Sequence, residues 1–248
     1  MEQSRQGNAV ISGSGQLAGG LYDNITISGS SNINGDINAL DVKISGSAHF
    51  YGHVSSESVT VNGSAKFDGD INTNRYVSSG SSIIKGHVHG RIITSNGSMS
   101  CKKDIRAEEI KNNGSMHVNG DIEAESFNTS GGFHVKGLLN ASEVKVNMSG
   151  RCFAHEIGGD EIIVKYSRLN IVSNLFRSLF DKFGYGDMWR LQSAQIEATD
   201  VSLEWSKVGI VRGSRVEIGS GCIIGLIEYT ETVDIHPNAI VDQVKRIV

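Results

Sequence analysis

Residues 59–71 read Val-Thr-Val-Asn-Gly-Ser-Ala-Lys-Phe-Asp-Gly-Asp-Ile, and the features of this stretch return at every seventeenth position. Self-similarity at a fixed short period is the signature of a solenoid, so we predict a stack of coils about 17 residues long. The first glycine series is Gly29, Gly46, Gly63, Gly80, Gly97, Gly114 and Gly131, and the second is Gly35, Gly52, Gly69, Gly86, Gly120 and Gly137, with Lys103 replacing one glycine.

Apolar residues recur at the same interval and alternate with polar residues inside each copy, which is the period of a β-strand. We therefore expect short strands whose alternate side chains share one interior. Three columns carry this pattern: Ile25, Val42, Val59, Tyr76, Ile93, Ile110, Phe127 and Val144; Ile33, Phe50, Phe67, Ile84, Cys101, Val118, Val135 and Cys152; Ile37, Val54, Ile71, Val88, Ile105, Ile122 and Leu139.

The two glycine series predict corners, where a residue without a Cβ can adopt positive φ. Serine or asparagine precedes each glycine of the first series, which is typical of turns. A third bend near Leu40 and Asp41 would make each coil triangular, and successive coils would pair as parallel strands. A period of 17 is not a multiple of six, so we predict a right-handed parallel β-helix rather than a left-handed hexapeptide helix.

Two further columns exchange bulk along the chain. Ile44 and Val61 give way to Ser78 and Ser95 in one column, while four positions on Ala48 and Ala65 give way to Met99 and Met116. A close-packed interior requires such compensation, so we predict that both columns face inward and share one layer of the core.

The chain is expected to divide into a short polar tail (1–8), a β-helix (9–166), a helical insertion (167–187) and C-terminal β-helix coils (188–248). In the last part, Val201, Ile218 and Ile235 are again spaced by 17, as are Trp205, Cys222 and Ala239. Whether these coils continue the same solenoid or form a second one stays open at this point.

The insertion carries the one helical signal, an apolar stripe at helical spacing that stops at Gly184. We expect an amphipathic α-helix that packs on the solenoid or contacts a partner, with a membrane surface as the alternative. Its apolar face consists of Val172, Leu175, Phe176, Leu179, Phe180 and Phe183.

Composition narrows the cellular setting. The net charge is -4 with both signs mixed, which argues against nucleic acid as a partner. The first eight residues lack a signal-peptide profile and no apolar run is long enough to span a membrane, so we expect a cytoplasmic protein. Cys101 and Cys152 fall in one column three coils apart, too far for a disulfide, so the cysteines are expected to be reduced and buried.

The phrase V-x-I-x-G-x-A-x-F-x-G-x-I, seen at residues 42–54, 59–71 and 110–122, resembles the bactofilins, bacterial polymer-forming cytoskeletal proteins. The resemblance covers residues 9–156, and residues 201–244 resemble the C-terminal part of the longer Firmicute-type members. It implies a right-handed β-helix that assembles end to end without nucleotide, in the cytoplasm and often at the membrane. It also implies a scaffold for cell-shape, envelope or motility machinery, with a paralogous chain as a further partner.

A ladder of acidic residues and histidines follows the second corner: Asp36, His53, Asp70, His87, Asp104 and Asp121. Stacked at about 4.8 Å, such side chains could hold a divalent metal or act as acid and base. We favour a solvated corner ladder, because no third ligand or groove wall is evident. We therefore expect no catalytic, cofactor or metal site and no enzyme activity. The alternatives are a polysaccharide hydrolase or lyase, and an acyltransferase suggested by two hexapeptide-like stretches at residues 218 and 235.

Two functions from different classes remain. An end coil exposes unpaired backbone groups beside apolar columns, which favours a filament of stacked copies. The alternative is a non-polymerising β-solenoid that binds partners through a flat face. The candidate end-contact residues are Val10, Ile11, Ile240, Val241, Ile247 and Val248.

Overall fold

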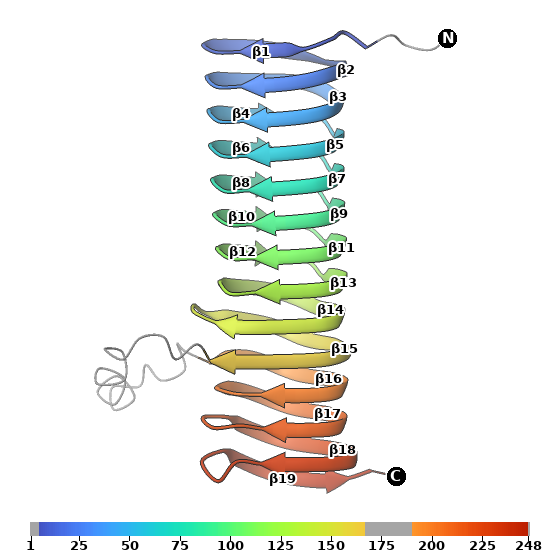
Figure 1. Cartoon of the computed structure of the whole chain (residues 1–248), viewed down its shortest axis with the longest axis vertical. Coiled ribbons are helices and arrows are strands. Elements are labelled where there is room, and N and C mark those ends of the chain that lie inside the picture. Colours follow the sequence, from blue (N-terminus) through green and yellow to red (C-terminus); the bar gives the residue numbers. More distant parts are fainter. Residues whose placement is uncertain (1–4, 167–189, 248) are drawn as a thin grey trace, which may run out of the picture. The chain divides into compact units, whose positions relative to one another are not determined.

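The computed structural model describes residues 5–166 and 190–247, and every regular element within those ranges is a β-strand. The chain divides into two units, Met1–Glu125 and Ser126–Val248, and each is described by itself. In each unit the strands stack as parallel coils (Figure 1). This confirms the all-β parallel solenoid with coils of about 17 residues. The expected amphipathic helix lies outside the described residues, and the right-handed sense stays a prediction.

From β4 onward unit 1 alternates short and long strands, because each coil there has one four-residue side and one eight-residue side. Its strands are β1 (Ala9–Ile11), β2 (Ser14–Ile27), β3 (Ser30–Ile44), β4 (Ser47–Phe50), β5 (Val54–Val61), β6 (Ser64–Phe67), β7 (Ile71–Ser78), β8 (Ser81–Ile84), β9 (Val88–Ser95), β10 (Ser98–Cys101), β11 (Ile105–Asn112) and β12 (Ser115–Val118); β13 (Ile122–Thr129) crosses the boundary.

Unit 2 has longer strands separated by fewer corners. They are β14 (Gly132–Met148), β15 (Cys152–Tyr166), β16 (Leu191–Leu203), β17 (Ser206–Ile218), β18 (Ile223–Ile235) and β19 (Ile240–Arg246). β15 pairs in parallel with β16 from Cys152↔Leu191 to Val164↔Leu203. The C-terminal coils therefore stack on β15 within unit 2.

The register in unit 1 keeps every apolar column in line. Val42 pairs with Val59, and Val59 pairs with Tyr76, without a slip. The β3–β5 pairing passes from Ala39↔Ser56 to Asp41↔Ser58 and skips the position between them, where the third bend was predicted. Every described member of the three columns is at most 2% exposed, so within each unit alternate residues form an interior.

The exchange of bulk between two columns is confirmed. Met99 and Met116 are each 1% exposed, and Ser78 and Ser95 are fully buried. The Ser78 and Ser82 hydroxyls lie 2.8 Å apart, so residues four apart meet across the corner inside the core. Side chains before and after the corner therefore fill the same layer of the core, and a large one on one side goes with a small one on the other, as close packing requires.

Two predicted alignments in unit 2 are wrong because the corners there change length. Cys152 pairs with Phe133 and not with Val135, because this pair is spaced two residues wider than the 17-residue coils of unit 1. Val201 pairs with Val216 rather than Ile218, because Leu191 pairs with Ser206 and that coil is two residues shorter than the 17-residue coils of unit 1. The tight corner places Trp205 at a φ of 48°, which is rare for a bulky residue.

The glycines lie largely where expected, but the predicted reason is wrong. Glycines of the first series lie between consecutive strands, whereas Gly35 and Gly137 lie inside β3 and β14. Of the two series, only Gly35 has a φ in the left-handed region, +98°. Close approach is the cause instead: a Cβ on Gly63 would lie 2.0 Å from the carbonyl oxygen of Gly46, one coil before it. The corners stack so closely that backbone meets backbone.

Replacing Gly63 with alanine should therefore destabilise the fold by about 1–3 kcal/mol, because the coils must move apart at that corner. Gly13→Ala is the matched control, since a Cβ there meets no heavy atom within 4 Å. Urea unfolding of both variants measures the difference. Equal stability of the two variants would contradict the close approach.

The shared core layer predicts a compensating pair of substitutions. Ala65→Met should cost about 1–3 kcal/mol by overpacking, because Val61 already fills the layer. Adding Val61→Ser reproduces the arrangement of Ser95 with Met99 and should restore most of the loss. A double-mutant cycle measured by thermal unfolding tests this, and simple additivity of the two changes would count against a shared layer.

Candidate functional site: uncovered coil edges

The first edge of interest belongs to unit 1. β1 pairs with β2, from Ala9↔Ile25 to Ile11↔Ile27, and no other described strand covers its second side. The interior side chains at this edge, Ala9, Ile11 and Leu17, are half-buried. One coil further in, Ile25, Ile27 and Ile33 are 0% exposed. The last interior side chains of unit 1 are therefore partly exposed at this edge.

The second edge belongs to unit 2, where β19 pairs with β18. Val241 and Val244 continue the columns of Ile224 and Ile227; Val244 is 47% exposed, whereas Ile227 is fully buried. β19 covers β18 only as far as Tyr229, so residues 230–235 form an uncovered edge within the described residues. Val233 and Ile235 on that edge are half-buried, whereas their partners Val216 and Ile218 are 1–2% exposed.

The structure separates the predicted end residues into two kinds. Ile11 and Val241 lie on interior columns, whereas Val10 and Ile240 point outward and are 68% and 60% exposed. Ile247 donates its N–H to the carbonyl of Tyr229 at 2.8 Å, and Val248 lies outside the described residues. Sequence reasoning missed Leu17, Val233 and Val244, although the strand alternation placed each of them on an interior column.

The candidate partner helix cannot be placed. Val172, Leu175, Phe176, Leu179, Phe180 and Phe183 all lie outside the described residues. Within the described ranges no helix is long and apolar enough to cross a bilayer.

Comparison with known proteins identifies part of the chain. The model of the family described as "Bactofilin: Polymer-forming cytoskeletal" matches residues 3–89. These residues form a bactofilin domain. The family is structural and not enzymatic.

A similar protein of Bacillus subtilis carries no described function. The uncharacterized protein YhbF of Bacillus subtilis (strain 168) is 35% identical over 103 residues, which make up 41% of this chain and 38% of that protein. The similarity therefore spans well under half of the relative's length. No solved structure matches this chain.

The acidic and histidine ladder of the bactofilin domain is bonded from coil to coil. The backbone N–H of His53 donates to Asp36 Oδ1 (2.7 Å), and the N–H of Asp70 donates to His53 Nδ1 (3.0 Å). In the next coil the N–H of His87 donates to Asp70 Oδ1 at 2.8 Å. Each side chain thus satisfies a corner N–H that the parallel ladder leaves unpaired, which is a structural role.

The described ranges offer little support for metal binding or for cysteine-based nucleophilic chemistry. No three His, Cys, Asp or Glu side chains there come close enough to hold a metal ion. Burial raises the pKa of Cys101 and of Cys222 to about 11 and that of Cys152 to about 12, so the thiolates that nucleophilic chemistry needs are scarce at neutral pH.

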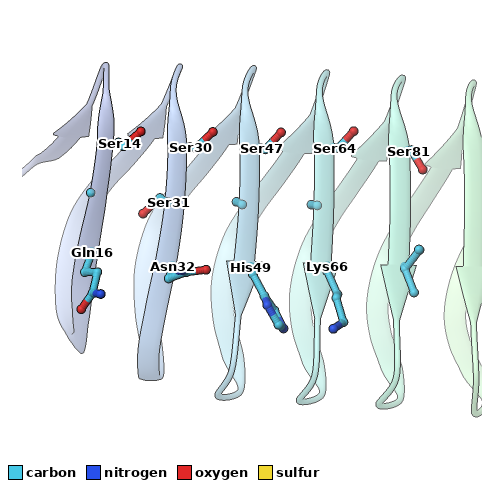
Figure 2. A pocket seen from close by; sticks show the side chains of 14 residues that line it. Ser14, Gln16, Ser30, Ser31, Asn32, Ser47, His49, Ser64, Lys66 and Ser81 are labelled. Carbon is cyan, nitrogen blue, oxygen red and sulfur yellow. The ribbon is translucent and has the colours of Figure 1, made fainter.

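The side wall of the bactofilin domain carries one open groove of about 690 Å³ (Figure 2). Figure 2 shows two parallel rows of side chains along it, with Ser47 and Ser64 in one row and His49 and Lys66 in the other. No carboxylate or thiol lines it, and the imidazole of His49 contacts Asp68 (Nε2 to Oδ2, 3.1 Å). The groove offers hydrogen-bonding groups for a surface partner.

The corner ladder predicts a pH dependence at Asp70. The N–H donated by His87 is the main cause that lowers the pKa of this carboxyl below its ordinary 3.8. A lowered folded-state pKa means that the stabilisation is present above the unfolded pKa and is lost as pH falls through the folded value.

Asp70→Asn should therefore lower the free energy of unfolding by about 1 kcal/mol at pH 7. The difference in this free energy between variant and wild type should be smaller at pH 3. Urea unfolding at the two pH values measures the gap. Asp160→Asn, which replaces an exposed carboxyl, is the control. A gap that stays constant from pH 7 to pH 3 would rule out this role of the charge.

Proposed function

We propose that this protein assembles with itself, without nucleotide, into filaments by end-to-end stacking of β-solenoids. The filament then serves in the cytoplasm as a scaffold for cell-shape, envelope or motility machinery. The carrying observation is the pair of uncovered coil edges, each with a row of backbone groups beside half-buried aliphatic side chains. The family description of the matched domain as polymer-forming and cytoskeletal supports this proposal.

The physical drive comes from two sources at each edge. Backbone N–H and C=O groups along an edge strand are a template for a further strand. Beside them, Ile11, Leu17 and Val244 leave apolar surface in water, and burying such surface contributes about 25 cal/mol per Å². Stacking a second coil satisfies both at once, because a parallel neighbour pairs the backbone and covers the column.

The sequence of the whole chain supports the nucleotide-independent part of this proposal. A phosphate-binding P-loop needs the pattern G-x-x-x-x-G-K-[ST], and no Gly-Lys pair occurs anywhere in the 248 residues. We therefore expect assembly to respond to protein concentration and temperature and not to added ATP or GTP.

Purified protein viewed by negative-stain electron microscopy should show filaments, and Ile11→Asp or Val241→Asp should each reduce the sedimented polymer at least tenfold. A carboxylate on an interior column would be desolvated in the stacked contact, which is costly without a partner. Ile83→Asp is the matched control, because Ile83 is an exposed aliphatic residue on the side wall at 44%. This control should assemble like wild type.

Circular dichroism of each variant checks that the solenoid itself stays folded. Isolated rods in wild-type preparations at all concentrations would reject the filament and favour a non-polymerising binding module. Normal filaments from both edge variants would show that the contact lies elsewhere.

A further inference from the structure

We propose that residues 172–183 of this chain pack as an amphipathic α-helix on the outer wall of unit 2. The docking site is one outward row of side chains on β15–β19, which we call the outer row. Its members pair in parallel from one coil to the next: Phe153, Gln192, Lys207, Ile223 and Ile240. The inference does not depend on the proposed self-assembly, because the helix and the wall belong to one copy.

The outer row lies beside the corner at which residues 167–189 leave the wall and return to it. Tyr166 is the last described residue before this segment, and Arg190 is the first after it. The Arg190 guanidinium donates from Nε to the carbonyl oxygen of Gly221 at 3.1 Å. The ring centroids of Trp205 and Tyr166 lie 5.5 Å apart, and Cζ of Arg190 lies 5.6 Å from the Trp205 ring centroid. Both ends of the segment are therefore held at one corner.

The outer row offers apolar surface at both of its ends. Ile240 is 60% exposed, and Ile223 and Phe153 point outward and are half-buried. Between them lie Gln192 and Lys207, whose aliphatic stems can pack against apolar side chains while their polar ends stay in water. The row contains no carboxylate. It therefore fits the apolar stripe that the sequence of the segment predicts at helical spacing.

The wall on the other side of this corner has a different chemistry. Its outward residues include Asp200, Arg215, Glu217 and Asp234. The guanidinium of Arg215 pairs with the carboxylates of Asp200 and Glu231. An apolar helix on that wall would take carboxylates out of water without giving them new partners, which is costly. The distribution of charge therefore favours the outer row.

The dimensions of the row and of the helix agree. From Phe153 to Ile240 the row spans four coil spacings of about 4.8 Å, or about 19 Å. A helix from Val172 to Phe183 would be about 18 Å long at a rise of about 1.5 Å per residue. The chain on either side of the helix can extend by about 3.3 Å per residue. Five residues before the helix and six after it are therefore enough to reach the ends of the row from the corner.

Limited trypsin digestion, below the protein concentration at which filaments form, tests the contact. The segment contains Arg177 and Lys182, which trypsin recognises, and a protease needs backbone that is locally unfolded. Ile223→Asp places a carboxylate beneath the apolar stripe and should speed cleavage at these two residues at least tenfold. Ile163→Asp is the matched control, because Ile163 is a half-buried outward residue on the other wall of the same corner. This control should be cleaved like wild type.

A double-mutant cycle distinguishes direct contact from a general loosening of the fold. Phe176→Asp on the apolar stripe should speed cleavage as much as Ile223→Asp does. Combining the two changes should add little, because either one alone already removes the contact. Circular dichroism during thermal unfolding checks that the solenoid of each variant stays folded. If wild type is cleaved as fast as Ile223→Asp, or if the effects of the two changes multiply, the helix does not lie on the outer row.

Two other locations of the apolar stripe are outcomes that would overturn the proposal. Phosphatidylglycerol vesicles that float wild type and Ile223→Asp alike, but not Phe176→Asp, would place the stripe in a membrane surface. Protection from trypsin that begins only when filaments form would place the stripe on a second copy.

Discussion

The structure depends on how closely one coil approaches the next at the first corner. There a glycine Cα faces the carbonyl of the preceding coil with no space for a Cβ, and this recurs from Gly29 to Gly114. The close approach lets the parallel ladder run on into the corners, because N–H groups such as that of Gly63 still reach a carbonyl of the coil before. A fixed separation at the corner in turn keeps the strands in register, and register places each apolar residue on its column.

An interior built this way has no natural boundary along its axis. Each coil buries the apolar side chains of the coil before it and is buried by the coil after it. Only the edge coils therefore leave apolar surface of the columns in water. Within one column, Ile11 at the edge is half-buried, whereas Ile27 in the next coil is fully buried. Function by assembly thus needs no special site, because the edge repeats the chemistry of the core.

Much of this was predictable from sequence. The period, the three columns and the exchange between Ala65 and Met99 follow from counting residues, because a regular ladder converts sequence distance into position. The alignment fails where coils change length, as at Trp205, since the gain or loss of one or two residues leaves no mark on an irregular corner. Positive φ was the wrong reason for the corner glycines, because contact with a distant coil is invisible in a local pattern. Along the edges, Val10 looked equivalent to Ile11 until the register showed which of them faces inward.

The central claim is that coils are stacked by hydrogen bonds along one axis, both within a copy and between copies. X-ray diffraction from aligned filaments tests it most directly, because strands perpendicular to the axis diffract along it at their spacing of about 4.8 Å. We predict a strong reflection at that spacing on the meridian, parallel to the filament. A reflection at the same spacing on the equator would show coils stacked across the filament, and would contradict the account.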